Sequence, residues 1–473
     1  MRPTWAIGGL DLFLDLPAAR PRRGLEDALR AAVTDGLLLP GTRLPATRTV
    51  AADLGIARNT VAQVYEQLAA EGWLTSRVGA GTWVALPVAD PRPDRSPRPP
   101  AARPVARTPR VDLRAGLPDA TGFPGREWAA AVRRAVLDAP AGALGYPDPR
   151  GVPAAREALA GYLARTRGVR AAAEHVVLAR GFGGLLAVVC RALAAAGASR
   201  IAVEEYGHQR HRDTIAAAGM AVVPLPVDRD GADVARLADL GADAVLLTPA
   251  HQFPTGVALA PDRRLAVVRW AAAAGALVLE DDYDGEFRFD RRAVGALQAL
   301  APEHVLYAGT ASKSVGPGLG LAWAVAPERL VAPLARETEL LGGGPSGVDQ
   351  LALAAFVRAH ELDRSVRRLR QHYRTRRARV AAVVAERLPG CAVGGLPAGL
   401  HCLVELPAGT PEAAVVAAAA RRGVRLEGLS AFAAAGADES RRPAVVVGYG
   451  APGAHAFDAA LDAAADAIAE VVG

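Results

Sequence analysis

One lysine stands alone in a chain whose other basic side chains are all arginine. Lys313 is the single lysine among the 55 lysine and arginine residues of the 473-residue sequence. Arginine stays protonated and cannot act as an amine nucleophile, whereas a lysine shielded from water can. Under so strong a bias towards arginine, a retained lysine indicates a candidate site of amine chemistry. Chance is the alternative, and the neighbouring residues must decide between the two.

Acidic, aromatic and polar side chains follow the ends of predicted strands. The sequence ALVLEDDYDGEF predicts a strand over 276–281 that ends at Asp281, with Tyr283 just beyond it. Lys313 comes directly after another predicted strand, and TPAHQFPTG follows a third over 244–248. Because the carboxyl ends of parallel strands meet at one crevice of an α/β sheet, we expect these side chains to converge.

A lysine, a carboxylate and a phenol at one site match the requirements of pyridoxal phosphate chemistry. The amine forms a Schiff base with the aldehyde, and the carboxylate keeps the pyridine nitrogen protonated so that the ring acts as an electron sink. A tyrosine hydroxyl can hydrogen-bond the ring oxygen. Singly, a Ser-Lys pair is usually a solvated turn and an acidic run usually faces water. Together, Lys313, Asp281 and Tyr283 predict a cofactor site.

The elements that must position this site alternate along residues 111–473. Short β-branched runs predict strands over 175–179, 201–204, 221–225, 244–248, 276–281, 305–308 and 321–325. Alanine-rich stretches predict helices over 185–196, 208–218 and 261–274. This alternation is typical of an α/β fold with a mostly parallel sheet and helices on both faces. A helical region over 350–387 follows, and then an α+β segment with strands near 401–406 and 444–447 and a helix near 455–472.

A proline-rich segment divides the chain. Residues 87–110 contain eight prolines, six arginines and two aspartates, a net charge of +4 out of +6 for the whole chain. Such a composition predicts a semi-rigid linker that reaches about 70 Å when fully extended. We therefore expect an N-terminal domain over 1–86 and a larger domain over 111–473.

Residues 1–86 show the pattern of a winged helix-turn-helix. Helical spacing over 22–36 ends at a glycine, Thr47 is a predicted N-cap for a helix over 50–54, and Gly55 supplies the turn. The next helix, predicted over 58–71, follows at once, and two short helices joined by such a turn are typical of DNA-binding motifs. Two short strand-like runs, over 73–76 and 81–85, then suit a wing with its tip at 77–80.

The run PGTRLPATRTVAADLGIARNTVAQVYEQLAAEGWLTSRVGAGTWV resembles the DNA-binding domain of GntR-family regulators. The resemblance implies that the helix beginning at Arg58 enters the major groove of a double-stranded DNA operator, with the wing near the minor groove. Arginine can grip guanine, asparagine or glutamine can grip adenine, and hydroxyls hold phosphates. A helical interaction module with solvated arginines is the alternative. The expected contacts are Arg43, Arg48, Arg58, Asn59, Thr60, Gln63, Arg77 and Gly79.

The larger domain resembles fold-type I aminotransferases, on the segments YPDPRG at 146–151, EDDYDGEF and GTxSK. Together with the winged helix, the chain resembles the MocR/PdxR subgroup of GntR regulators, in which an aminotransferase class I/II-like domain binds the effector. The resemblance implies homodimers whose N-terminal domain packs on the partner subunit, responding to pyridoxal phosphate alone or with an amino compound. It assigns the cofactor contacts to Lys313 as the aldimine lysine, Asp281 at the pyridine nitrogen, Tyr283 at the ring oxygen, and Thr310 and Ser312 at the phosphate.

Two departures from the family pattern fall on the phosphate anchors. Gly320 stands seven residues after Lys313, where the family usually has a phosphate-binding arginine. The turn at 181–184 reads Gly-Phe-Gly-Gly in place of glycine followed by Ser-Gln-Gln, so that from Gly181 onward only backbone N–H groups at a helix N-terminus are left to hold an anion. Arg180 and Arg442 are candidates to compensate.

Two further departures fall on the ring and the substrate. His208 stands where an aromatic, commonly tyrosine, stacks on the cofactor ring, and histidine can still stack. Val446 stands where an arginine normally pairs with the substrate carboxylate. Charge-assisted pairs are the strong ones, so their loss predicts weakened binding and argues against productive transamination.

Three functions stay open. The first is a transcriptional regulator that senses pyridoxal phosphate, an amino compound or both through an aldimine at Lys313. The second is a regulator whose degenerate aminotransferase fold serves dimerisation or another effector, which Gly320 and Val446 favour. The third is an active aminotransferase carrying a DNA-binding domain. All three keep DNA binding.

Composition narrows the class and the compartment. Hydrophobic residues make up 51% and charged residues 22%, which excludes a wholly disordered or fibrous chain. The longest apolar stretch, over 185–198, is broken by Arg191 and is too short to span a membrane. The three cysteines lie far apart, as expected in a reducing compartment without disulfides or a zinc site. These features predict a soluble, cytoplasmic protein.

Overall fold

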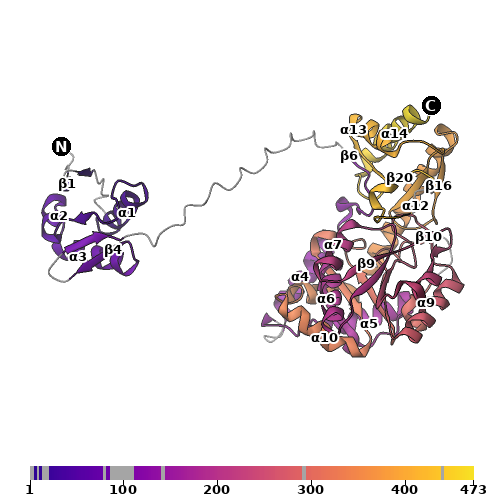
Figure 1. The fold of residues 1–473 in the computed structure, drawn as a ribbon, viewed down its shortest axis with the longest axis horizontal. Coiled ribbons are helices and arrows are strands. Elements are labelled where there is room, and N and C mark those ends of the chain that lie inside the picture. The colour runs from indigo at the N-terminus through magenta and orange to yellow at the C-terminus, as the bar shows by residue number, and fades with distance from the viewer. Residues whose placement is uncertain are drawn as a thin grey trace. The chain divides into compact units, whose positions relative to one another are not determined.

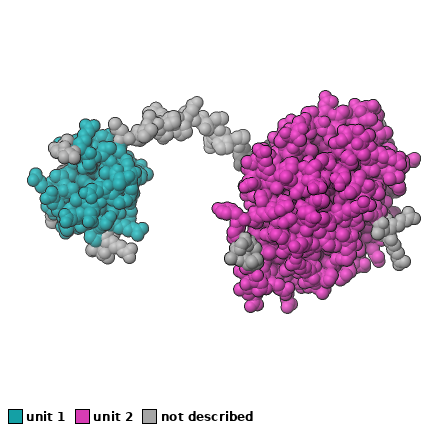
Figure 2. Space-filling model, turned by 90° about the horizontal axis from the view of Figure 1, so that it is seen from below, with its two compact units in different colours: residues 1–106 teal, residues 107–473 magenta. Residues whose placement is uncertain are grey.

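The chain forms two compact units, residues 1–106 and 107–473, each of which is described separately (Figure 2). The computed structural model describes residues 5–7, 10–12, 21–77, 81–85, 111–139, 144–289, 294–437 and 442–473. The predicted linker over 87–110 lies outside these ranges. Among the described helices, none is long and apolar enough to cross a membrane.

Unit 1 contains the helices and the wing strands that the sequence predicts. A short antiparallel hairpin, β1 (Trp5–Ile7) with β2 (Leu10–Leu12), precedes them. The three helices are α1 (Pro21–Thr34), α2 (Thr47–Leu54) and α3 (Arg58–Ala70). The antiparallel sheet has the order β3 (Arg43–Leu44), β5 (Gly81–Val84), β4 (Leu74–Arg77). Gly55, in the left-handed region at φ 63°, makes the turn between α2 and α3.

The start of α2 differs from the prediction. Ala46 is the N-cap residue, with extended φ and ψ and no side-chain cap bond, and Thr47 is already the first helical residue. The assignment of Thr47 as the N-cap is therefore wrong, because the chain leaves the extended conformation one residue earlier. The helix still packs through Val50 and Ala51, which belong to the same apolar core as Leu29 of α1.

Unit 2 is built on a seven-stranded sheet that is parallel except at one strand. Strand β15 runs antiparallel to both of its neighbours, β14 and β7, and all other pairs are parallel. The prediction of a mostly parallel sheet is confirmed, with strand bounds within two residues. In spatial order the strands are β7 (Val176–Arg180), β15 (Leu321–Val325), β14 (Val305–Thr310), β13 (Leu277–Asp281), β12 (Ala244–Leu247), β8 (Arg200–Glu204) and β9 (Ala221–Leu225).

Helices cover both faces of this sheet. Successive residues of a strand point to opposite faces, and apolar side chains are present on both faces. In β7, Val177 and Ala179 join one apolar cluster, while Val176 and Leu178 join another. Helices α6 and α9 lie on opposite sides (Figure 1). The first face carries α6 (Gly181–Ala195), α7 (Gln209–Ala217) and α10 (Glu328–Leu340). The second carries α5 (Pro153–Arg167), α9 (Pro261–Ala274), α11 (Gly347–Arg358) and α12 (Glu361–Arg387), and α4 (Gly125–Asp138) packs on α11.

The region predicted as one helical stretch over 350–387 is divided. His360 adopts the left-handed conformation at φ 57°, which ends α11 and allows α12 to start at Glu361. A non-glycine residue in this region is uncommon, so hydrophobic spacing could not have located the break.

A smaller antiparallel sheet follows towards the C-terminus. Val446 is fully buried in this sheet, opposite Leu403 and Glu427. The order is β16 (Ala392–Gly394), β17 (His401–Glu405), β20 (Ala444–Gly448), β19 (Glu427–Gly428), with helices α13 (Glu412–Arg421) and α14 (Ala454–Val472). Short elements complete the unit: β18 (Val424–Arg425) paired with β6 (Val111–Asp112), β10 (Val227–Asp228) paired with β11 (Gly231–Ala232), and α8 (Leu237–Leu240).

Candidate functional site

A cavity opens at the carboxyl edge of the parallel strands. Asp281 ends β13, Thr310 ends β14 and Glu204 ends β8, and all three line it. The convergence expected from the sequence is therefore present. Six of the seven residues predicted to contact the cofactor line this cavity: Lys313, Asp281, Tyr283, Thr310, Ser312 and His208. Gly181 does not line it, but its neighbour Phe182 does.

Lys313 is held by a segment far away in the sequence. Its Nζ donates a hydrogen bond to the carbonyl oxygen of Gly116 at 2.5 Å. Burial lowers the pKa of Lys313, while the carboxylates of Asp284 and Asp281 oppose the shift. A lowered amine pKa increases the neutral, nucleophilic fraction at neutral pH. Nothing in the local sequence around Gly116 signals this contact.

Asp281 has a free oxygen in the cavity. The residue is 6% exposed, and its Oδ1 atom has no hydrogen-bond partner among the described residues. Burial raises the pKa of Asp281 well above its usual value, and the neighbouring Asp282 raises it further. A buried polar atom is normally paired, so this carboxylate lacks a donor. A protonated pyridine nitrogen supplies a donor of the right charge, so the residues present fit pyridoxal phosphate.

Tyr283 is oriented by two buried residues, His251 and Asp284, which the sequence analysis placed only in polar segments at strand ends. Its hydroxyl lies 3.2 Å from Nδ1 of His251, and the same nitrogen lies 2.8 Å from Oδ2 of Asp284. Burial raises the pKa of Tyr283 well above its usual value, with Asp284 the next cause. The phenol therefore stays protonated and is available as a hydrogen-bond donor.

The two hydroxyls after β14 are bonded to each other. Thr310 Oγ1 lies 2.9 Å from Ser312 Oγ and 3.1 Å from the carbonyl oxygen of Leu321. The Ser312 backbone N–H in turn donates to Thr310 Oγ1 at 3.1 Å. This arrangement holds both hydroxyls in the cavity wall. Their contact with a phosphate stays a prediction.

Glu204 is a cavity residue that the sequence analysis did not assign. Its Oε2 accepts hydrogen bonds from the Thr248 hydroxyl at 2.5 Å and from Gln252 Nε2 at 3.3 Å. Burial raises the pKa of Glu204 to about 7, against the lowering effect of these bonds. The sequence puts Glu204 at the end of a predicted strand, and this position is the signal that could have identified it as a cavity residue.

Where the family usually has a phosphate-binding arginine, this chain has Gly320, near the turn at 181–184. Leu321 pairs with Arg180 across β15 and β7, so Gly320, which precedes β15, and Gly181, which follows β7, lie at the same end of this strand pair. Gly320 has φ 60° and caps the 3-10 helix Pro317–Leu319. Neither proposed substitute lines the cavity: Arg180 Nε donates to the Gly344 carbonyl oxygen at 2.9 Å, and Arg442 lines a separate hollow with Glu412 and Ser430.

The two remaining departures have different consequences. His208 stacks on Phe253, with ring centroids 4.0 Å apart and planes 24° apart. Packing by neighbouring side chains and then the positive charge of Lys313 lower the pKa of His208 to about 4, although the residue is exposed, so the ring is neutral and suited to stacking. Val446 lies in an apolar cluster with Phe253 and Tyr283. This part of the site therefore offers no cation at residue 446 to a substrate carboxylate.

In unit 1, the first two turns of α3 present polar side chains. Arg58, Asn59 and Gln63 are exposed and Thr60 is partly exposed, while the opposite face of the helix buries Val61 and other apolar residues. Recognition helices contact base edges mainly through their N-terminal residues. The side chain of Arg48 on α2 is also exposed.

The base of the wing carries two of the predicted arginines. The guanidinium carbons of Arg43 and Arg77 lie 5.7 Å and 5.9 Å from the ring centre of Trp83 in β5. Cation–π contacts of this kind hold both charges over one aromatic ring. Gly81 has φ 129°, which favours glycine. The remaining wing residue, Gly79, lies outside the described residues.

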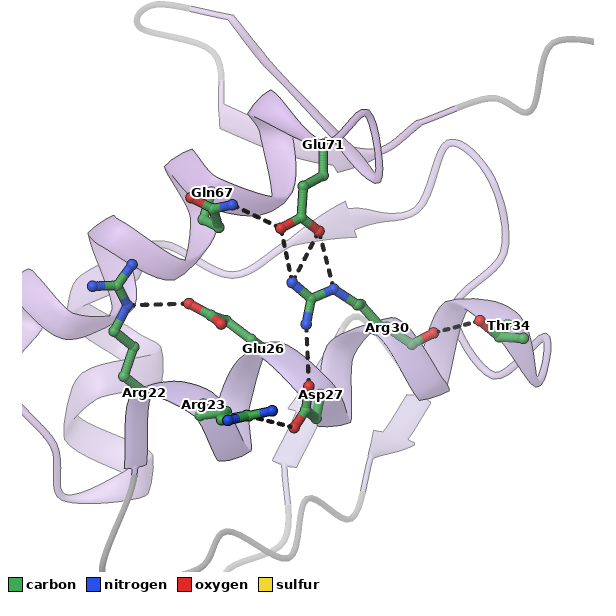
Figure 3. Close-up of polar contacts among 8 residues, drawn as sticks. All are labelled: Arg22, Arg23, Glu26, Asp27, Arg30, Thr34, Gln67 and Glu71. Atoms are coloured by element: carbon green, nitrogen blue, oxygen red, sulfur yellow. Dashed lines mark hydrogen bonds and ion pairs between the residues drawn. The ribbon is translucent and has the colours of Figure 1, made fainter. Parts of the chain in front are cut away.

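An ion-pair network fixes the far end of α3 to α1 (Figure 3). Arg30 of α1 donates from Nε and Nη2 to the Glu71 carboxylate at distances of 2.8–3.0 Å, and from Nη1 to Asp27 at 3.1 Å. Gln67 of α3 donates to the same Glu71 carboxylate at 2.8 Å. These bonds lower the pKa of Glu71. The bidentate contact joins the C-terminal cap of α3, Glu71, to α1.

Two family models match the two units. The model of bacterial regulatory proteins of the gntR family matches residues 21–84, and the model of aminotransferase class I and II matches residues 110–440. The chain is also 32% identical over 427 residues to the HTH-type pyridoxine biosynthesis transcriptional regulator PdxR of Corynebacterium glutamicum, covering 90% of this chain and 91% of that protein.

The chain belongs to the MocR/PdxR group of GntR-family transcriptional regulators. It is 35% identical over 382 residues to the probable rhizopine catabolism regulatory protein MocR of Rhizobium meliloti, covering 77% of each chain. The predicted family, its GntR-type domain and its function in transcription regulation are confirmed. Membership of this group implies that the protein binds DNA.

Solved structures confirm the fold of the larger unit of this regulator. The α-aminoadipate aminotransferase LysN of Thermus thermophilus, in complex with N-(5'-phosphopyridoxyl)-L-leucine, matches with a TM-score of 0.67 and 22% identity. The match covers 76% of this chain and 92% of that one. At this level of identity the likeness establishes the fold-type I architecture alone.

Proposed function

We propose that this regulator senses pyridoxal phosphate through Lys313 and thereby alters its binding to DNA. The observation that carries the proposal is the free Oδ1 atom of Asp281 in the cavity that also holds the Lys313 amine. A buried amine with a lowered pKa and a buried carboxylate without a donor are two complementary anchors for one ligand.

Each residue of the cavity has a separate task. Bound pyridoxal phosphate would supply an aldehyde and a pyridine ring that withdraws electrons. The amine of Lys313, which donates to the Gly116 carbonyl, would bind the aldehyde, and Asp281 would hold a proton at the ring nitrogen. Tyr283 would donate to the ring oxygen, and the neutral imidazole of His208 would stack on the ring. Thr310 and Ser312 would offer their hydroxyls to the phosphate.

Binding, rather than turnover, is the role that the cavity supports. Val446 is fully buried among apolar side chains where the family has a substrate-carboxylate arginine, so an amino acid substrate loses its strongest fixed contact. An amino compound can still exchange with Lys313 as an effector. A ligand changes the DNA-binding state only if it binds one arrangement of the two units better than the other.

The proposed active form is a homodimer bound to a double-stranded operator, with the N-terminal domain on the partner subunit. Unit 2 exposes apolar side chains near the end of α4 and beyond: Leu137 is 69% exposed, and Leu144 and Tyr146 are 54% and 104% exposed. Exposed apolar groups of this size favour an interface. Sedimentation of Leu137→Asp beside wild type tests this surface, and an unchanged dimer would exclude it.

Borohydride reduction after incubation with pyridoxal phosphate tests the proposal directly. Because Lys313 is the only lysine, peptide mass mapping should find the phosphopyridoxyl group at Lys313, and Lys313→Ala should lose it. Footprinting on the DNA upstream of its own gene, with and without the cofactor, should show a Lys313-dependent change. No adduct at saturating cofactor would refute the proposal.

A second candidate is a regulator whose aminotransferase fold serves dimerisation or another effector. Gly320 and Val446, which remove one cation from each end of the family's ligand site, favour it. This candidate predicts DNA binding that is unaffected both by pyridoxal phosphate and by Lys313→Ala. Measurable amino transfer would instead support an enzyme that carries a DNA-binding domain.

A further inference from the structure

One arginine close to the cavity has no assigned task. Arg210 lies in the first turn of α7, and its guanidinium lies over the glycine turn that begins α6. A Cβ atom placed on Gly183 would lie 3.7 Å from Arg210 Nη2 and 4.0 Å from Nε. The guanidinium is therefore within van der Waals reach of residue 183.

The guanidinium of Arg210 has neither a hydrogen bond nor an ion pair among the described residues. Its neighbour Arg212, by contrast, donates to the carbonyl oxygens of Glu205 and Phe432 at 2.9 Å and 2.6 Å. The N-terminus of a helix carries a partial positive charge and unpaired N–H groups. Arg210 is exposed, and an anion between its guanidinium and these N–H groups would be contacted by both.

The cavity extends to the neighbours of Arg210, although Arg210 itself is not among its lining residues. Phe182 of the glycine turn lines it, together with His208 and His211, and the rings of Phe182 and His211 lie 4.9 Å apart. The first turns of α6 and α7 therefore pack together at the cavity wall. The positive charge of Arg210 also contributes to the lowered pKa of His208 and His211.

An independent observation points to a ligand in the same cavity. The free Oδ1 atom of Asp281 and the amine of Lys313 define where a pyridine ring and its aldehyde would lie. The ligand has one further group, an anionic phosphate. Leu321 pairs with Arg180, so Gly320 before β15 and Gly181 after β7 lie at the same end of this strand pair, and the position that usually provides the phosphate cation borders this turn.

We infer that Arg210 provides the cation for the phosphate group of the cofactor, with the N–H groups of the turn at 181–184, in place of an arginine at residue 320. The inference rests on the proposed function and specifies its phosphate subsite. It also gives a reason for Gly183: a long side chain there would compete with the guanidinium, whereas glycine admits it.

Two aldehydes that differ only in the phosphate test this assignment on the full-length protein. Pyridoxal phosphate and pyridoxal are each titrated, and the absorbance of the Lys313 adduct gives the dissociation constant. In Arg210→Ala, the constant for pyridoxal phosphate should rise roughly 10- to 100-fold, as expected for loss of a charge-assisted contact. The constant for pyridoxal should stay unchanged. Arg180→Ala, whose guanidinium already bonds the Gly344 carbonyl, is the matched control and should bind as wild type does.

Two further variants guard against a folding defect. Arg210→Lys keeps the charge and should retain most of the affinity for pyridoxal phosphate. Gly183→Leu should weaken the binding of pyridoxal phosphate but not of pyridoxal, because the apolar side chain displaces the guanidinium without offering the phosphate a new polar group and without altering α7.

The outcomes separate the inference from the proposed function. Equal affinity of Arg210→Ala and wild type for pyridoxal phosphate overturns the inference, even if an amino acid effector then binds less tightly. Equal losses for both aldehydes overturn it as well, since the phosphate would then not be the group recognised. An absence of adduct in wild type with either aldehyde refutes the proposed function itself.

Discussion

Asp281 and Lys313 line the same cavity, and yet no ion pair joins them. Lys313 Nζ is bonded to the Gly116 carbonyl oxygen, and Asp281 Oδ1 has no partner among the described residues. Opposite charges that are buried near each other usually pair when nothing else requires them. Because the two groups are not paired with each other, the amine of Lys313 and the carboxylate of Asp281 are each available to contact a different part of one ligand.

Asp281→Asn should weaken cofactor binding and stabilise the protein without cofactor. The pKa of Asp281 is raised in the folded state, so wild-type stability falls as pH rises above the ordinary carboxyl value of about 4. The amide carries no charge and lacks this loss, and the gain at neutral pH should be about 1–3 kcal/mol, because a charged buried group costs more to leave without a partner than a neutral one. Thermal melting from pH 5 to pH 8 measures it. A gap between variant and wild type that does not widen with pH would contradict the assignment.

The reactivity of Lys313 should extend to lower pH than that of an ordinary lysine. Burial lowers the pKa of Lys313, and the negative charge of Asp281 partly opposes this. The rate of adduct formation should therefore reach half its maximum below pH 10.5, and Asp281→Asn should move that midpoint lower still. Stopped-flow absorbance with pyridoxal gives the profile without interference from the phosphate. A midpoint at the value of a free lysine would show that the amine is solvated.

Glu204→Gln should flatten part of the pH dependence of stability. The folded-state pKa of Glu204 is raised from 4.5 to about 7, so between these values the folded protein binds a proton that the unfolded chain releases. Wild-type stability therefore falls as pH rises through this window, by up to about 3 kcal/mol at 1.4 kcal/mol per pKa unit. Denaturant titrations from pH 5 to pH 8 compare the two proteins. Glu386→Gln, at an exposed position, is the control and should leave the profile unchanged.

Substitution of two arginines of unit 1 should weaken DNA binding in different ways. Arg58→Ala, in the first turn of α3, should lose about 1–3 kcal/mol of operator affinity and relax specificity at one base pair. Arg43→Ala, beside Trp83 at the wing, should weaken all sequences alike and reduce the salt slope by about one. Binding to operator and to scrambled DNA at several salt concentrations separates the two effects. A uniform loss for Arg58→Ala would place that side chain on the phosphate backbone instead.

The sequence predicted most of the architecture because its signals are local. β-Branched runs located all seven strands of the large sheet, and strand-end residues such as Asp281, Tyr283 and Lys313 converge because strand direction brings them together. Contacts made by distant segments were not predictable. Gly116 contacts Lys313 although the two lie 197 residues apart in the sequence. Arg210 became a candidate phosphate contact only when the structure placed its guanidinium near Gly183.

Restoring the missing arginine is the sharpest test of how the phosphate end is held. Gly320 has φ 60°, and a Cβ placed there meets nothing within 4 Å, so Gly320→Arg fits but should cost about 1–2 kcal/mol of stability for the left-handed backbone. Gly320→Ala carries the same strain without the charge and is the matched control. The arginine should lower the dissociation constant for pyridoxal phosphate relative to the alanine. If Arg210 already serves the phosphate, the improvement should be larger in Arg210→Ala than in the wild-type background, because two cations at one phosphate partly replace each other. Equal improvements in both backgrounds would show that residues 320 and 210 do not share a ligand group.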